Sequence, residues 1–351
     1  MQRYLAVFTA SRVYGKLREN YTIEVKKLFD EKLSDATGTV EREELILAKE
    51  KALTHKTDLR RSARLGVAAV AFVVKGYIRG NLFPSDDVLD VGTCLEQIVS
   101  GADIDDEADD EKTTLTPLQY KAFKTSGRHL IANGELGLEE LSVIDEYNQG
   151  KSAVVAGQKV DLKFGRLLKE GKFGDIINQR EKFRQGWEQK IGRRGIAYWL
   201  ARTVYDGIGG KSSREKEIVA DHLGNCGQLW QIGDDIKDLT TDTMAFDDPS
   251  AKIVPANSIV IQAINEGLQA PTNSFKILLV LRHEFDNIVG SWYRRYEELA
   301  EESLRTWSES GIRGSDIYAS GALDYTSHKV EERMNGLKTT VENFEVGTCG
   351  H

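Results

Sequence analysis

Apolar residues recur at intervals of three and four along almost the whole chain, and this spacing is typical of amphipathic α-helices. No segment shows the alternation of apolar and polar residues that a half-buried strand requires. Glycine and proline separate the apolar segments, for example at Pro84, Gly171 and Pro249. The pattern predicts an all-α protein with helices over residues 2–34, 40–53, 58–80, 85–104, 116–132, 135–148, 151–170, 174–206, 212–239, 256–267, 273–309 and 322–344.

The composition supports this interpretation. Only 5 prolines occur in 351 residues, and long stretches are rich in the residues that favour helices. Neither an internal repeat nor a Ser/Gly-rich linker divides the chain. We therefore expect a single helical domain over residues 1–345, a bundle of helices around a central cavity, followed by a loose tail at residues 346–351.

Charge and cysteine usage narrow the classes of function. A formal net charge of −8 argues against a nucleic-acid partner, which normally meets a basic surface. Cys94, Cys226 and Cys349 are far apart and form neither a zinc motif nor a disulfide framework, so a reducing, cytoplasmic location is expected. The longest apolar run, residues 65–74, is too short to span a bilayer, and no signal peptide is recognisable.

The first candidate for chemistry is the acidic segment Asp-Ile-Asp-Asp-Glu-Ala-Asp-Asp-Glu at residues 103–111, which follows an apolar helix. Asp105 and Asp109 are four residues apart and would share one face of a helix. Clustered carboxylates repel one another unless a cation neutralises them, and Mg²⁺ prefers such oxygen ligands. Taken alone, the segment is also compatible with a solvated acidic loop.

The second candidate repeats the arrangement more than a hundred residues later. Residues 227–238 read Gly-Gln-Leu-Trp-Gln-Ile-Gly-Asp-Asp-Ile-Lys-Asp, so an apolar helix is expected to end in an acidic motif with Asp234 and Asp238 on one face. Two such motifs facing each other across a cavity would hold Mg²⁺ ions on either side of one diphosphate. Withdrawing electrons from its oxygens makes pyrophosphate a leaving group. Apolar helices behind the motifs would line a dry pocket for a hydrocarbon chain.

These motifs resemble those of the trans-isoprenyl (polyprenyl) diphosphate synthases, which have the all-α isoprenoid synthase fold. The resemblance covers roughly residues 55–270. The family's two acidic motifs match Asp105, Asp106 and Asp109, and then Trp230, Gln231, Asp234, Asp235 and Asp238. Weaker matches are Asn133-Gly134-Glu135, the Gly-Gln-x-x-Asp-Leu segment at residues 157–162, which contains Gln158, and Lys-Ile-Val-Pro at residues 252–255.

The resemblance implies a role for each matched residue. Asp105, Asp109 and Asp234 are expected to be the catalytic magnesium ligands, with Asp106, Gln231, Asp235 and Asp238 orienting them. Lys190, Arg194 and Lys252 are expected to bind the diphosphate of an allylic isoprenyl substrate. Ser100, Gly101 and Gln158 are assigned to the pocket, and the small side chains of the first two leave room for a long chain. The resemblance also implies a homodimer.

Three departures leave the acceptor open. The glycines of the family's Gly-Gly-Lys-Arg segment are missing where this chain has Arg60, Arg61 and Arg64, which are candidates for a second diphosphate but also fit a solvated helix face. The arginine pair expected after the first motif is replaced by Lys-Thr-Thr-Leu-Thr-Pro at residues 112–117, and the central Lys-Thr pair by Arg194-Gly195.

The sequence therefore predicts a magnesium-dependent prenyltransferase that transfers the allylic cation to isopentenyl diphosphate or another acceptor. One alternative is a terpene cyclase that needs no second substrate. Others are a non-catalytic partner subunit of a prenyl diphosphate synthase and a helical interaction protein with two acidic patches.

Overall fold

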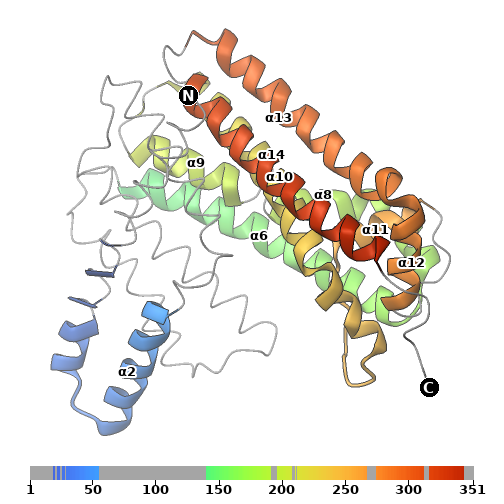
Figure 1. The fold of residues 1–351 in the computed structure, drawn as a ribbon. Coiled ribbons are helices and arrows are strands. Elements are labelled where there is room, and N and C mark those ends of the chain that lie inside the picture. Colours follow the sequence, from blue (N-terminus) through green and yellow to red (C-terminus); the bar gives the residue numbers. More distant parts are fainter. Residues whose placement is uncertain are drawn as a thin grey trace. The chain divides into compact units, whose positions relative to one another are not determined.

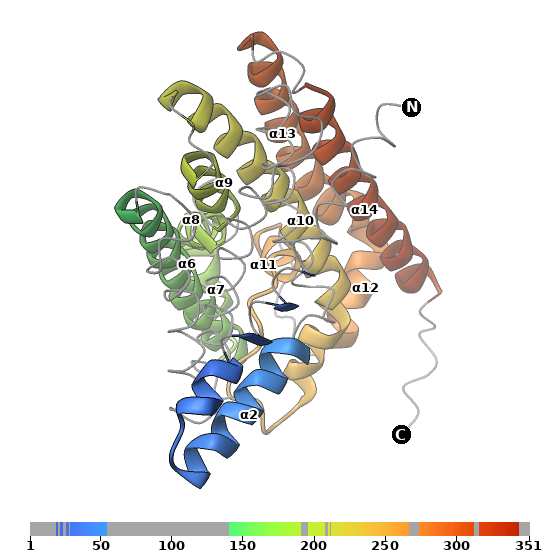
Figure 2. The ribbon, with the colours of Figure 1, turned by 90° about the vertical axis from the view of Figure 1, so that its left-hand side faces the viewer.

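The fold is described from a computed structural model, which describes residues 19, 22–23, 26–27, 29–54, 140–190, 196–207, 210, 212–266, 274–311 and 316–343 (Figure 1; turned by 90° in Figure 2). Residues 29–35 are helical. The elements that follow are α2 (Thr39–Thr54), α6 (Glu140–Lys169), α7 (Phe173–Asn178), α8 (Arg180–Lys190), α9 (Ile196–Gly207), α10 (Ser213–Asp247), α11 (Ser258–Asn265), α12 (Ser274–Phe285), the π-helical turn η2 (Asp286–Gly290), α13 (Ser291–Glu309) and α14 (Asp316–Glu342).

The predicted all-α class is confirmed, since no described residue lies in a strand. Helix α10 shows how the spacing of apolar residues corresponds to the buried side of a helix. Its residues Leu229, Ile232, Ile236 and Leu239 are all at most 3% exposed and recur at intervals of three and four. A stripe of this kind lies on one side of a helix and is buried there. Within the described ranges, none of the helices is long and apolar enough to cross a membrane.

The chain forms two compact units. The first combines the described parts of residues 1–151, 199–219 and 311–321, and the second those of residues 152–198, 220–310 and 322–351. In the first unit, the end of α9 contacts the start of α10. The Nζ of Lys216 lies 2.9 Å from the Asp206 carboxylate, and the Tyr205 hydroxyl donates to Glu215 at 2.7 Å. The acidic motif of α10 belongs to the second unit.

The break expected between the helices over residues 135–148 and 151–170 is wrong, because α6 runs without interruption from Glu140 to Lys169. Gly150 is buried, and a Cβ at this position would lie only 2.6 Å from the Cβ of Trp199. The glycine thus permits a close approach between side chain and helix and does not end the helix. The residue that requires a glycine here, Trp199, is far away in the sequence, so the local pattern could not reveal the contact.

The end predicted for the helix of the second acidic motif is also wrong. Helix α10 continues for nine residues past Asp238, to Asp247. Its last turn is stabilised by Lys169 of α6, whose Nζ donates to the carbonyl oxygens of Ala245 at 3.0 Å and Asp248 at 2.7 Å. The acidic motif therefore lies within a helix, where the position of each carboxylate is fixed by the helical period.

Two long predicted helices are divided. The helix expected over residues 174–206 consists of α7, α8 and α9, and the first division is at Gln179. The helix expected over residues 273–309 consists of α12, η2 and α13, with a non-helical backbone at Glu284 (φ −119°, ψ 22°). The π-turn at residues 286–290 buries Ile288 and Val289 while continuing into α13.

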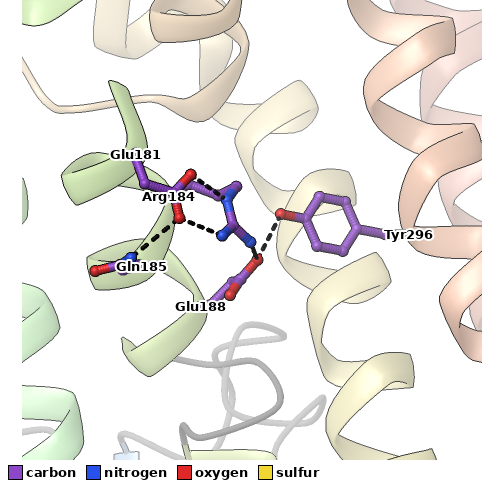
Figure 3. A network of polar contacts seen from close by, with 5 residues as sticks. All are labelled: Glu181, Arg184, Gln185, Glu188 and Tyr296. Atoms are coloured by element: carbon purple, nitrogen blue, oxygen red, sulfur yellow. Dashed lines mark hydrogen bonds and ion pairs between the residues drawn. The ribbon is translucent and has the colours of Figure 1, made fainter. Parts of the chain in front are cut away.

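An aromatic cluster joins α8 to α13 in the second unit. The ring of Trp187 lies 5.4 Å from that of Trp292 and 5.1 Å from that of Tyr296, and all three residues are at most 6% exposed. Beside the cluster, the guanidinium of Arg184 lies between the carboxylates of Glu181 and Glu188, and the Tyr296 hydroxyl donates to Glu188 at 3.2 Å (Figure 3). These contacts fix the position of Trp187.

Gly165 offers a test of the packing between α6 and the segment that follows α10. Its carbonyl accepts a hydrogen bond from the Val254 N–H at 3.2 Å, and an added Cβ would lie 2.6 Å from the Val254 carbonyl oxygen. Replacing Gly165 by Ala should lower the free energy of unfolding by roughly 1–3 kcal/mol, because backbone atoms must move apart. Urea denaturation measures this change.

The control is Gly336→Ala in α14, where an added Cβ meets nothing within 4 Å. Because alanine favours helix, this variant should gain about 0.5–1 kcal/mol. A Gly165→Ala variant as stable as the Gly336→Ala variant would show that the close approach at Val254 is not a constraint.

Candidate active site

Many of the residues predicted for the site lie outside the described ranges. These are Arg60, Arg61, Arg64, Ser100, Gly101, Asp105, Asp106, Asp109 and Arg194. For Gln158 and Lys190 the structure describes the backbone, which is helical in α6 and α8. The described part of the site therefore consists of the second acidic motif and its surroundings.

Asp234 pairs with an arginine from the C-terminal helix. Its Oδ1 accepts a hydrogen bond from Nη1 of Arg333 at 2.8 Å, and the two side chains are only 20% and 24% exposed. Burial raises the pKa of Asp234, whereas Arg333 acts in the opposite direction. The nearby carboxylate of Asp238 raises that pKa further, and Lys237 lowers it. Asp234 thus lies in a half-buried environment where negative charge gathers and cations are favoured.

Arg333 is held against Trp230 as well as Asp234. Its Cζ lies 4.9 Å from the centre of the Trp230 ring, a cation–π contact, and that ring stacks on Tyr325 at 6.1 Å and 14°. Gly233 makes room for the arginine, because a Cβ there would lie 2.9 Å from Nη1 of Arg333. Contacts between α10 and α14 therefore place one guanidinium at the acidic motif.

Asp235 has a different environment from its neighbour. Its Oδ1 accepts from Nε2 of Gln231 at 2.7 Å. Its Oδ2 accepts from Nε1 of Trp187 at 3.3 Å, from the Ser258 N–H at 3.2 Å and from the Ser258 hydroxyl. This carboxylate is surrounded by protein donors from α8, α10 and α11. It therefore fits a supporting part in the site and not that of an open metal ligand.

The start of α11 is fixed on α10 next to Asp235. Asn257 caps α11 by accepting from the Ile259 N–H at 3.0 Å, while its amide nitrogen donates to the Asp235 carbonyl at 2.6 Å and to Asp242 at 3.0 Å. The segment that contains Lys252 runs between the end of α10 and this cap. Both of its ends are therefore held by α10.

The face of α10 that carries Asp234 and Asp238 suits a divalent cation on Asp234, with Asp238 beside it. The two residues are one helical turn apart on the same face of α10, they repel each other electrostatically, and their oxygens are the ligands that Mg²⁺ prefers. Within the described residues, no group of three or more His, Cys, Asp or Glu side chains lies close enough together to hold a metal ion. The remaining predicted ligands, Asp105 and Asp109, lie outside those residues.

A groove of about 590 Å³ lies elsewhere in the second unit, between α8, α10 and α13. Three arginines and three glutamates line it together with Gln228 and Leu299. None of the acidic-motif residues contributes to it. Because the opposite charges of its lining balance, the groove has no net positive charge with which to bind a diphosphate.

Sequence reasoning missed Arg333, Trp187, Asn257 and Ser258. Arg333 is 99 residues from Asp234 along the chain, and Trp187 is 48 residues from Asp235. In the sequence Arg333 follows Glu331 and Glu332 and has the pattern of a solvated helix face. The signal that was available for Asn257-Ser258 is local, since Asn before an apolar run is a typical helix start.

The role of Asp235 leads to a stability prediction. Asp235→Asn replaces one acceptor oxygen by an NH₂ group that faces the donors of Trp187, Ser258 or Gln231. We expect the free energy of unfolding to fall by roughly 2–3 kcal/mol, because a charge-assisted bond is lost and a buried donor is left without an acceptor. Denaturant melts measure this, with Glu301→Gln on the exposed surface of α13 as the control. Equal stability of the two variants would refute the supporting role.

No protein-family model and no curated protein matches the sequence. Solved structures do match. A geranylgeranyl pyrophosphate synthetase from the archaeon Geoglobus acetivorans superposes with a TM-score of 0.61 at 14% identity, covering 91% of this chain and 98% of that one. A decaprenyl diphosphate synthase from Rhodobacter capsulatus gives 0.61 at 13% identity, covering 92% and 99%.

A third structure, a polyprenyl synthase from Roseobacter denitrificans, has a TM-score of 0.56 at 14% identity, with 92% of this chain and 99% of that chain covered. Likeness over nearly the full length of each chain, at such low identity, concerns the backbone arrangement. The resemblance predicted from the acidic motifs is thus confirmed at the level of fold. The chain has the all-α fold of the trans-isoprenyl diphosphate synthases.

Proposed function

We propose that this protein is a magnesium-dependent isoprenoid synthase that ionises an allylic isoprenyl diphosphate and transfers the cation to an acceptor. The observation that carries the proposal is the division of tasks within the second acidic motif. Asp235 accepts hydrogen bonds from Gln231 and Ser258, whereas Asp234 and Asp238 lie on another face of α10, where Arg333 pairs with Asp234. The similar structures from Geoglobus acetivorans and Rhodobacter capsulatus are diphosphate synthases by name, which supports the same class of substrate.

Asp234 would hold magnesium together with Asp105 and Asp109 of the first motif. Bound there, the metal would supply positive charge that neutralises the diphosphate oxygens. The bond between the allylic carbon and its oxygen then breaks, and the electron pair leaves with pyrophosphate. A double bond or other nucleophile of the acceptor attacks the cation, and a proton is lost, with the released pyrophosphate as the base. No nucleophilic side chain is required.

The remaining residues of the site would bind and orient. Lys190, Arg194 and Lys252 are the proposed contacts of the diphosphate, and an arginine at position 194 can bind phosphate oxygens through two parallel hydrogen bonds. Gln231 and Asp235 would keep α10 in place, and Asp106 and Asp238 would orient the ligands of the metal. Ser100, Gly101 and Gln158 would line the hydrocarbon pocket.

The departures from the family's motifs bear on the acceptor. Arg60, Arg61 and Arg64 would bind the diphosphate of isopentenyl diphosphate in a chain-elongating enzyme. Since the glycines of that segment are missing, a terpene cyclase is the second candidate. A single domain over residues 1–345, a homodimer and a cytoplasmic location are part of the same proposal.

Removing either metal-binding motif tests the reaction. Asp105→Ala and Asp234→Ala should each lower the rate of pyrophosphate release from an allylic diphosphate by at least about 100-fold, because the leaving group is no longer stabilised. Release is measured with magnesium from geranyl, farnesyl and geranylgeranyl diphosphate. Glu301→Gln serves as the control, and circular dichroism verifies folding. Undiminished release in a folded Asp234→Ala variant would contradict the metal assignment.

The acceptor is tested with the same substrates, with and without isopentenyl diphosphate, by mass spectrometry of the organic extract. Release that depends on isopentenyl diphosphate and gives longer diphosphates indicates chain elongation. Release without it, with hydrocarbons or alcohols as products, indicates cyclisation. Wild-type protein that releases no pyrophosphate from any of the three substrates would contradict the proposed substrate class.

A further inference from the structure

Arg333 is positioned differently from the other cations of α14. Its side chain is only 24% exposed, donates to Asp234 and lies over the Trp230 ring. Lys329 and Lys338 of the same helix are more exposed and pair with Glu332 and Asp286. Arg333 is thus the cation that α14 contributes to the acidic motif in the described part of the chain.

The hydrogen bond to Asp234 uses only part of the donor capacity of the Arg333 side chain. A guanidinium has five N–H donors in a planar arrangement. Among the described residues, Arg333 donates one side-chain hydrogen bond, from Nη1 to Asp234. The place of the guanidinium is limited by the Trp230 ring, whose centre lies 4.9 Å from Cζ, and by the space that Gly233 leaves. The remaining donors therefore lie beside a carboxylate that the proposed function assigns to magnesium.

The charge of the site explains why such a cation is needed. Magnesium on Asp234 would weaken the attraction between Asp234 and Arg333, because two cations would compete for one carboxylate. A diphosphate brought to the same place supplies new acceptor oxygens, to which an arginine binds in a bidentate manner. The sequence lacks arginines directly after the first motif, where residues 112–117 contain one lysine as their sole basic residue.

We infer that Arg333 is a diphosphate-binding residue of the site, and that Asp234 is its partner only while no diphosphate is bound. This inference rests on the proposed function. On binding of a diphosphate with magnesium, the guanidinium exchanges the Asp234 oxygen for phosphate oxygens and stays beside Trp230. Helix α14 then supplies positive charge that the first motif lacks.

The first test is calorimetric titration of the full chain with inorganic pyrophosphate in the presence of magnesium. Arg333→Gln should weaken pyrophosphate binding by roughly ten- to a hundredfold, the range expected for charge-assisted hydrogen bonds. Lys329→Gln removes one positive charge of the same helix from a side chain that pairs with Glu332, and it should change the affinity by less than about twofold. A folded Arg333→Gln variant with wild-type affinity overturns the inference.

A second test uses the wild-type protein and is independent of how the variants fold. Phenylglyoxal modifies exposed arginines, and mass spectrometry follows each site. Pyrophosphate with magnesium should slow the modification of Arg333, while Arg305, which is exposed on α13, serves as the internal control and should react at the same rate. Equal reaction of Arg333 with and without pyrophosphate overturns the inference.

The two proposals fail in different ways. Wild-type protein that releases pyrophosphate from an allylic diphosphate, but shows neither the affinity loss nor the protection, retains the proposed function and refutes the role of Arg333. Protein that shows both effects with inorganic pyrophosphate and releases none from allylic diphosphates supports the role of Arg333 and refutes the substrate class.

Discussion

The carboxylate of Asp235 is the contact on which the arrangement around the acidic motif depends. Near this position the buried side of α10 carries apolar residues such as Leu229, Ile232 and Ile236, and a charge placed among them must be matched by donors. Those donors come from α8 through Trp187, from α10 itself through Gln231 and from the first residue of α11 through Ser258. A negative charge also suits the N-terminus of α11. One carboxylate therefore fixes three helices relative to one another.

The direction of the neighbouring carboxylate follows from helical geometry. Successive residues are rotated by about 100° around the axis, so Asp234 cannot face the same donors as Asp235. Asp238, one turn later, returns to the side of Asp234. The motif is thereby divided into a structural acid and a charged face, and Arg333 is drawn to that face because Gly233 leaves space beside it.

The spacing of residues along the sequence correctly predicted those features of the fold that follow from the helical period. The all-α class, α2 and the shared face of Asp234 and Asp238 all follow from spacing. The helix boundaries and the position of Arg333 depend instead on contacts between segments that are far apart in the sequence. Gly150 is inside α6 because Trp199 packs against it, and α10 extends past its acidic motif with Lys169 at its end. Arg333 resembles any surface cation until α14 is placed beside α10. Asp105 and Asp109 lie outside the described residues and remain a prediction.

We propose that both acidic motifs hold metal around one diphosphate. Crystals grown with manganese and pyrophosphate test it most directly, because manganese replaces magnesium on oxygen ligands and its anomalous scattering marks each ion. We expect anomalous peaks bonded to Asp105, Asp109 and Asp234, with pyrophosphate between them. Pyrophosphate bound with no manganese on Asp234, or manganese on Asp234 with Asp105 and Asp109 far from it, would rule out this metal site.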